Sequence, residues 1–178
     1  MLTDKRPIHA FSSILTAITF AAGLSLMGAE AHAQQRMAEA VTGPFEGLAG
    51  IWKGTGVITM KDGGHERIRC HGTYSVQSGG NNLQQQLRCA SDSYKFETNT
   101  DITHSGGQLL GNWSENTRHV AGRVSGRATR GSIHARAEGD TFTALLSVTT
   151  NGDRQTVSIQ SPGSALTEVM ISLTRGLR

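Results

Sequence analysis

Short runs in which apolar and polar side chains alternate fill the chain after position 50, and glycine-rich turns separate them. This period of two is typical of β-strands with one buried face. The turns at 62–64, 78–81, 105–107, 138–140 and 151–153 combine glycine with Asp, Asn, Ser or Glu, and glycine supplies the positive φ of tight hairpins. The pattern predicts ten strands, over residues 51–60, 66–76, 83–91, 93–103, 108–114, 119–129, 132–138, 141–150, 154–160 and 168–175.

The segment between the two cysteines predicts its own strand register. With a turn centred between Gly79 and Gly80, counting outward places Cys70 directly opposite Cys89. Facing residues of an antiparallel pair lie about 4.5 to 5.5 Å apart, a separation that a disulfide tolerates. A redox pair is the alternative, but the C-x-x-C spacing is missing. The same register pairs Val76 with Leu83, Tyr74 with Gln85, and Gly72 with Leu87. We therefore predict a cross-strand Cys70–Cys89 disulfide.

Sequential hairpins with one apolar face favour an all-β fold, a single antiparallel up-and-down barrel of about ten strands, because a closed sheet has no free edge. A two-sheet sandwich is the alternative. The inward face is predicted to carry Trp52, Ile58, Met60, Phe96, Ile102, Leu109, Trp113, Val120, Val124, Ile133, Phe142, Leu146, Val148, Val157, Ile159, Val169, Ile171 and Leu173.

The first 33 residues have a different pattern. Lys5 and Arg6 precede an apolar run over 14–27, and 31–33 reads Ala-His-Ala, the small-x-small pattern of a signal-peptidase site. We expect a signal peptide over 1–33, cleaved after Ala33, and a periplasmic or secreted protein that is not membrane-spanning. A retained anchor is the alternative, although about fourteen apolar residues are fewer than a spanning helix needs. Residues 34–47 are expected to be a short helix or loose, and 48–178 the barrel domain.

Charge gives a weaker indication. The chain has 17 Lys and Arg residues against 14 Asp and Glu residues. If neighbouring hairpins align, outward-facing arginines would form a basic stripe for an anionic envelope surface; a solvated face is the alternative. Aromatic residues are too few and too inward for nucleic-acid stacking, so no nucleic acid is expected. The stripe would comprise Arg67, Arg69, Arg88, Arg123, Arg127 and Arg136, with Arg130 at a turn.

No catalytic or metal-ligating pattern stands out. The five histidines after residue 33 are scattered singly, and a zinc site needs three or four converging ligands. There is no Gly-x-Ser-x-Gly and no phosphate loop. We therefore expect no enzyme activity, no metal and no cofactor. The histidines are His65, His71, His104, His119 and His134.

Residues 44–56, PFEGLAGIWKGTG, resemble the opening of lipocalin-like (calycin) β-barrels, nearest the nitrobindin and fatty-acid-binding branch, whose barrels have ten strands. Gly50 and Trp52 match the Gly-x-Trp that opens the first strand. The resemblance implies that Trp52 lies at the closed base and that Arg175, on the last strand, packs over it. Nitrobindin-like proteins bind haem through a histidine near the C-terminus. The last strand here, 169–175, has none, so haem binding is not implied.

Two features bear on ligand binding. Tyr74 and Gln85, paired across the hairpin, are the expected polar contacts, and Phe96 and Trp113 the aromatic ones. Glycines on the inner face either leave room for a ligand or relieve crowding where strands bend. These glycines are Gly54, Gly56, Gly72, Gly111, Gly122 and Gly126.

We expect a non-enzymatic periplasmic binding protein that holds a small apolar or amphipathic ligand inside the barrel. The alternative is a secreted inhibitor or cell-envelope interaction protein that acts through its loops and N-terminal segment. A hydrolytic enzyme is a third, weaker hypothesis.

Overall fold

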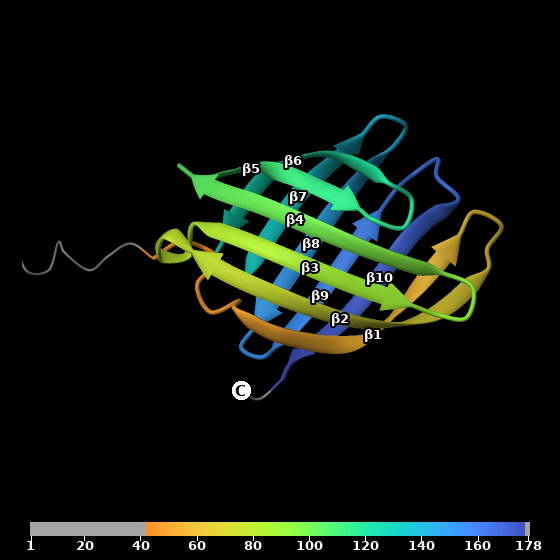
Figure 1. The fold of residues 1–178 in the computed structure, drawn as a ribbon, viewed down its shortest axis with the longest axis horizontal. Helices are drawn as coiled ribbons and strands as arrows, with labels where there is room; N and C mark the ends of the chain where they lie inside the picture. Colours follow the sequence, from red (N-terminus) through yellow and green to blue (C-terminus); the bar gives the residue numbers. More distant parts are fainter. Residues whose placement is uncertain (1–41, 177–178) are drawn as a thin grey trace, which may run out of the picture. The chain divides into compact units, whose positions relative to one another are not determined.

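Ten antiparallel strands close into a barrel in the computed structural model, which describes residues 42–176 (Figure 1). The strands are β1 (Gly50–Met60), β2 (His65–Gln77), β3 (Asn82–Ala90), β4 (Lys95–Ser105), β5 (Gln108–Glu115), β6 (Val120–Thr129), β7 (Ser132–Gly139), β8 (Thr143–Asn151), β9 (Arg154–Gln160) and β10 (Leu166–Arg175). Each strand pairs with its chain neighbours, and β1 also pairs with β10, which closes the sheet. The predicted barrel is confirmed, the sandwich is wrong, and every predicted strand end lies within two residues of the observed one.

Strands on opposite walls of the barrel cross each other because each strand is tilted relative to the barrel axis. Figure 1 shows β2, β3 and β4 running across the front, while β8, β9 and β10 cross behind them at a steep angle. Odd-numbered strands run from one end of the barrel to the other and even-numbered strands return. One end therefore carries the β2–β3, β4–β5, β6–β7 and β8–β9 turns, and we call it the base. The opposite end, which we call the mouth, carries the remaining five connections.

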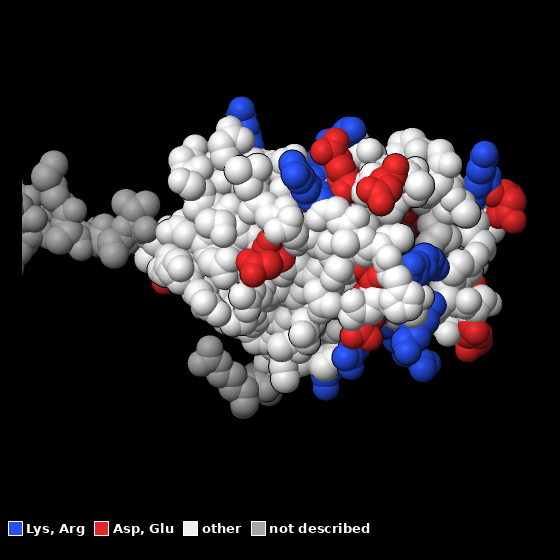
Figure 2. Space-filling view, turned by 45° about the horizontal axis from the view of Figure 1, so that its top comes forward, with Lys and Arg blue, Asp and Glu red and all other residues white. Residues whose placement is uncertain are grey.

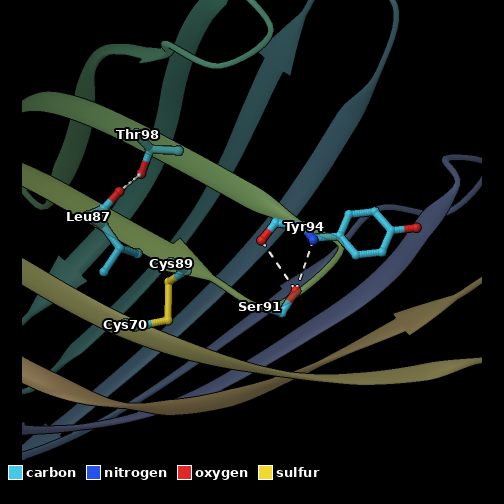
Figure 3. Close-up of a disulfide and its surroundings, with 6 residues drawn as sticks. All are labelled: Cys70, Leu87, Cys89, Ser91, Tyr94 and Thr98. Carbon is cyan, nitrogen blue, oxygen red and sulfur yellow. Dashed lines mark hydrogen bonds between the residues drawn. A yellow bond between two sulfur atoms is a disulfide. The ribbon is translucent and has the colours of Figure 1, made fainter.

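The hairpin of β2 and β3 has the predicted register. A short 3-10 turn, η1 (Ser78–Gly80), joins the strands, and every pair counted outward from it agrees with the prediction. Cys70 and Cys89 form a disulfide with Cα atoms 4.1 Å apart (Figure 3). Both cysteines are buried and face the core beside Ile68. Closing this loop should stabilise the fold by about 3 kcal/mol on the chain-entropy estimate.

Residues 42–49 pack against the base ahead of β1. The amide of Gly43 donates to Gly79 O at 2.7 Å, and that of Phe45 to Gly80 O at 3.0 Å. A Cβ at Gly80, where φ is +87°, would lie 3.0 Å from Gly43 backbone atoms, so glycine permits this close approach. Phe45 is fully buried, so this part of the N-terminal segment is a turn anchored in the core. The expected signal peptide, its cleavage site and residues 34–41 lie outside the described residues.

Candidate ligand site at the mouth of the barrel

The base is sealed around Trp52. Its indole is fully buried, lies 5.7 Å from the Tyr74 ring at an interplanar angle of 29°, and donates through Nε1 to Leu48 O at 2.9 Å. The guanidinium carbon of Arg175 lies 5.1 Å from the centre of the indole, a cation–π contact. Two aromatic rings and the N-terminal turn therefore pack together at this end.

Arg175 is held in place by hydrogen bonds to two other segments. Its Nε donates to Asp153 Oδ1 at 2.9 Å, and its terminal nitrogens donate to the carbonyls of Gly47 and Gly152. It therefore ties the end of β10 to the β8–β9 turn and to the N-terminal segment. Its charge is already paired with Asp153, at 2.8 Å.

Tyr74, one of the expected ligand contacts, belongs to this sealed base. Its hydroxyl donates to Gln155 Oε1 at 2.7 Å, and Gln155 Nε2 donates to Thr150 Oγ1 at 3.0 Å. Burial raises the pKa of Tyr74 to about 12, against a smaller opposing effect of Gln85. The Tyr74 hydroxyl, which sequence analysis expected to bind a ligand, thus binds a side chain of β9. The predicted register covered only β2 and β3 and gave no information on β9.

Half-buried aromatic side chains gather at the mouth. The rings of Trp113 and Phe142 meet edge to face with centroids 5.3 Å apart, and Tyr94 donates to the sulfur of Met60 at 3.2 Å. Each packs against the core while part of its surface stays accessible. Aromatic and thioether groups offer a large apolar contact area to a ligand. The partly buried apolar side chains at this end are Met60, Tyr94, Phe96, Trp113, Phe142 and Leu166.

The β3–β4 loop positions Tyr94. Ser91 Oγ accepts the Tyr94 amide at 2.9 Å and donates back to the Tyr94 carbonyl at 3.3 Å (Figure 3). The Ser91 amide also donates to Tyr94 O, at 2.8 Å. This closed turn fixes the direction in which the chain re-enters β4 and holds the phenol at the rim.

Three of the four expected ligand residues lie on one cross-strand row. They are Tyr74, Gln85 and Trp113, and Thr100 lies between the last two. The fourth, Phe96, lies closer to the rim, opposite Cys89. Gln85 and Trp113 are half-buried, but Tyr74 is fully buried. The row runs through Tyr74, Gln85, Thr100, Trp113, Gly122 and Gly139.

The two glycines at the end of that row accommodate the indole of Trp113. A Cβ at Gly122 would lie 2.8 Å from Trp113 Nε1, and one at Gly139 would lie 3.2 Å from Trp113 Cζ2. The indole crosses two strands and donates to Glu138 O at 3.3 Å. Sequence analysis missed this arrangement. Its signal was a tryptophan followed by glycines at the facing positions of the next two strands.

The inner-face glycines mark close strand approach rather than space. A Cβ would meet the neighbouring strand's carbonyl oxygen at 1.8 Å from Gly54, 2.1 Å from Gly111, 1.7 Å from Gly122 and 2.2 Å from Gly126. At Gly72 it would meet side chains, with Tyr74 Cε1 at 2.9 Å. The suggestion that these glycines make room for a ligand is therefore wrong, and the crowding explanation holds.

Space inside the barrel is indicated instead by inward side chains that stay accessible. At mid-height on β1, β2 and β10, inward residues such as Ile58, Ile68 and Ile171 are fully buried. On β3 to β9, several residues with inward register are only half-buried and keep part of their surface accessible. They are Gln85, Phe96, Thr98, Thr100, Trp113, Ile133, Ala135, Leu146, Val148 and Ile159.

Glu115 is the buried carboxylate at the mouth. It accepts the amides of Glu97 at 2.9 Å, Thr117 at 3.0 Å and Arg118 at 2.8 Å, and the Thr117 hydroxyl. Burial acts to raise the pKa of this carboxyl, but the hydrogen bonds together outweigh it and lower the pKa to about 2. The group shapes the β5–β6 turn, and its acceptor capacity is used by the protein itself.

The outward arginines do not form one stripe. Arg67, Arg69 and Arg88 lie on β2 and β3, whereas Arg123 and Arg127 lie on β6, across the barrel in the strand order. Figure 2 shows basic side chains mixed with acidic ones on the face it displays. The expectation of a single anionic-surface stripe is wrong, because alternation along a strand predicts which face a residue takes but not which side of a closed barrel it occupies.

The outer surface also carries open grooves. One, of about 960 Å³, runs over β10, β1 and β2 and is bordered by Arg67, Arg69, Val57 and Met170. Two others, of about 550 and 500 Å³, lie over β1–β2 and over β6–β9. Small-molecule sites usually bury most of the ligand. These shallow grooves fit a macromolecular surface better than a small ligand.

No group of three or more His, Cys, Asp or Glu residues within 42–176 is placed to hold a metal ion. His71 and His134 are exposed, and His104 Nδ1 lies 3.1 Å from Asn81 Oδ1 at the base. Within the same range, no helix is long and apolar enough to cross a membrane.

No family model and no curated protein matches this sequence. The fold is similar to that of Rv2717c from M. tuberculosis, with a TM-score of 0.60 and 13% identity over 74% of this chain and 94% of that one. It is also similar to the S-type phycobiliprotein lyase CPES from Guillardia theta, with a TM-score of 0.51 and 10% identity over 75% and 91% of the chains. Both neighbours are lipocalin-like barrels, so this chain has a calycin-like fold. At such identities the likeness shows the fold alone.

Proposed function

We propose that this protein is a non-enzymatic periplasmic binding protein that takes a small apolar or amphipathic ligand into the barrel through the mouth. The observation that carries the proposal is the set of inward-facing side chains on β3 to β9 that keep accessible surface. A barrel with a sealed base, an unfilled wall and apolar rings at the rim can enclose a ligand from one side.

Within the calycin-like barrels, we place the protein nearest the nitrobindin and fatty-acid-binding branch. The support is the ten-strand count and the Gly50-x-Trp52 start, with Trp52 at the base. No haem is proposed, because the last strand has no histidine.

Catalysis is not part of the proposal, although one structural neighbour is named a lyase. Two of the inward titratable groups, Tyr74 and Glu115, are engaged by the protein, through Gln155 and through backbone amides. Neither is free to transfer a proton to a bound molecule.

The second candidate function is an envelope interaction protein that acts through the outer groove on β10, β1 and β2. It is favoured by Val57 and Met170, which face outward with 38% and 40% exposure beside Arg67 and Arg69. Exposed apolar side chains with a basic border suit a protein or membrane surface.

A titration with the neutral fluorophore N-phenyl-1-naphthylamine tests the leading proposal, using two adjacent leucines as a matched pair. Leu146 faces inward and is half-buried, whereas Leu145 faces outward with 47% exposure. We expect Leu146→Trp to fill the interior and weaken binding about tenfold or more, and Leu145→Trp to bind like the wild type. A wild type that takes up no probe would contradict the proposal and favour the envelope function. If the wild type binds the probe, native mass spectrometry of protein from its own periplasm is the measurement that identifies the natural ligand.

A further inference from the structure

We infer that the ligand is uncharged, a neutral molecule with an apolar body and one hydrogen-bonding group such as an alcohol, an amide or an ester. This inference rests on the proposed binding function and concerns the chemistry of the same interior.

The interior wall carries no charge between rim and base. Among residues 42–176, only three charged side chains occupy inward positions of the strands: Glu66 and Glu115 at the mouth, and Arg175 at the base. The accessible inward positions between them carry amide, hydroxyl, aromatic or aliphatic groups. A carboxylate or sulfonate entering the barrel would find no cation there.

Arg175 cannot serve as that cation. It pairs with Asp153 at 2.8 Å and donates to two carbonyls at the base. Its guanidinium packs on the fully buried indole of Trp52, at the base of the barrel. An anion would have to displace these partners and the aromatic seal to reach it.

The mouth itself favours neutral molecules over anions. Glu66 accepts the Ser93 amide at 3.0 Å, and Glu115 accepts three backbone amides. Hydrogen bonds from Ser91 and Ser93 lower the pKa of Glu66, as amides do for Glu115, so both rim carboxyls are ionised at neutral pH. Arg118 lies 3.6 Å from Glu115 and offsets part of that charge.

The remaining mouth cations do not reach inward. Lys61 lies in the exposed β1–β2 turn, and Lys95 is exposed and precedes the inward-facing Phe96 on β4. An unpaired anion that leaves water for an uncharged interior pays a large desolvation penalty. A neutral ligand avoids this penalty.

Neutral hydrogen-bonding groups are available at mid-height. Gln85 and Thr100 face each other on β3 and β4, and Thr98 lies one inward position nearer the rim. All three are half-buried. The Thr98 hydroxyl contacts Leu87 O at 3.5 Å, a long distance for a hydrogen bond (Figure 3). The wall formed by β7 to β9 is apolar instead, with Ala135, Leu146 and Ile159 facing inward on neighbouring strands. A ligand with one polar end and an apolar body matches this arrangement of the wall.

Two fluorophores with the same skeleton test the inference. N-phenyl-1-naphthylamine is neutral, and 8-anilinonaphthalene-1-sulfonate adds one sulfonate. We expect the neutral probe to bind the wild type about tenfold or more tightly than the anionic one. Leu146→Trp serves as the blank, because fluorescence of the anionic probe that survives this change comes from the outer surface.

A designed cation supplies the matched variants. Gln85→Lys places an ammonium group among the polar side chains halfway between the base and the mouth. We expect this change to raise the affinity for the anionic probe. We also expect it to raise the affinity for hexadecanoate, measured by displacement of the neutral probe. Gln86→Lys adds the same charge one residue along, at an exposed position on the outer face, and should leave both affinities unchanged. Equal or tighter wild-type binding of the anionic probe, blocked by Leu146→Trp, would overturn the neutral-ligand inference and leave the binding function standing. Uptake of neither probe would overturn both.

Discussion

The indole of Trp113 lies where side chains at Gly122 and Gly139 would otherwise stand. The three residues are consecutive members of one cross-strand row. An aromatic ring laid over glycines restores packing that the glycines remove, which is a known way to pin strand register. The finding explains why two adjacent strands carry glycine at facing positions in a wall that must also close tightly.

Replacing Gly122 tests this relationship. We expect Gly122→Ala to cost about 1 to 3 kcal/mol in the free energy of unfolding, because overpacking forces the backbone and the indole apart. Urea unfolding followed by tryptophan fluorescence measures both the stability and the movement of Trp113. Ala121→Ser, at the exposed neighbouring position, is the control and should change the unfolding free energy little. A Gly122→Ala variant as stable as the wild type would contradict the close approach described here.

Truncating Trp52 should weaken the base strongly. We expect Trp52→Ala to lower the free energy of unfolding by about 3 to 5 kcal/mol, as for other large truncations in a core. The change removes the ring that contacts Tyr74, Leu48 and Arg175. Trp113→Ala, at a half-buried position, should cost less. A cost below about 1 kcal/mol for Trp52→Ala would fall outside the range for a core residue and would mean that the base is not sealed by this side chain.

Mass mapping of protein folded under oxidising conditions should recover one peptide pair joined through Cys70 and Cys89 when no reductant is present. Replacing both cysteines with alanine should lower stability by about 3 kcal/mol, because the unfolded chain regains the freedom that the loop closure removed. Free thiols in the protein folded under these conditions would contradict the disulfide.

The free energy of unfolding should decrease in acid because the Glu115 carboxylate becomes protonated. Its folded pKa is about 2, below the ordinary value of 4.5. A lowered folded-state pKa means that the contribution is fully present above about 4.5 and is lost as the pH falls toward 2. Unfolding free energies measured at pH 7, 4.5, 3 and 2 should show this loss in the wild type. The loss should be reduced in Glu115→Gln, with the remainder including the contribution of Glu66.

Glu138→Gln provides the comparison for that series, because Glu138 is half exposed in its pair with Arg136. Its pH dependence should follow that of the wild type. A Glu115→Gln variant with the full wild-type acid loss would show that the Glu115 carboxylate does not carry it.

The fold was predictable where information is local. A turn at Gly79 and Gly80 set the hairpin register, and Cys70 and Cys89 provided an independent check on it. The partner of Tyr74 was not predictable, because Gln155 lies 81 residues away on β9 and meets it only after the barrel closes. Alternation placed arginines outward but could not say that β2 and β6 occupy different sides of the barrel.

The glycines show the same limit. Sequence placed them correctly on the inner face, but their purpose depends on how closely a neighbouring carbonyl approaches, as with Glu138 O at Gly122. That distance is set by the coiling of the whole sheet, which no local pattern records.

Both ends of the described chain emerge at the base. The amide of Gly176 donates to Ile51 O at 2.8 Å, beside the turn that precedes β1. A tether attached at either end therefore points the aromatic rim away from its attachment. Immobilised through a C-terminal tag, the protein should present the mouth to solution, so that ligand capture from a flowing mixture needs no reorientation of the molecule.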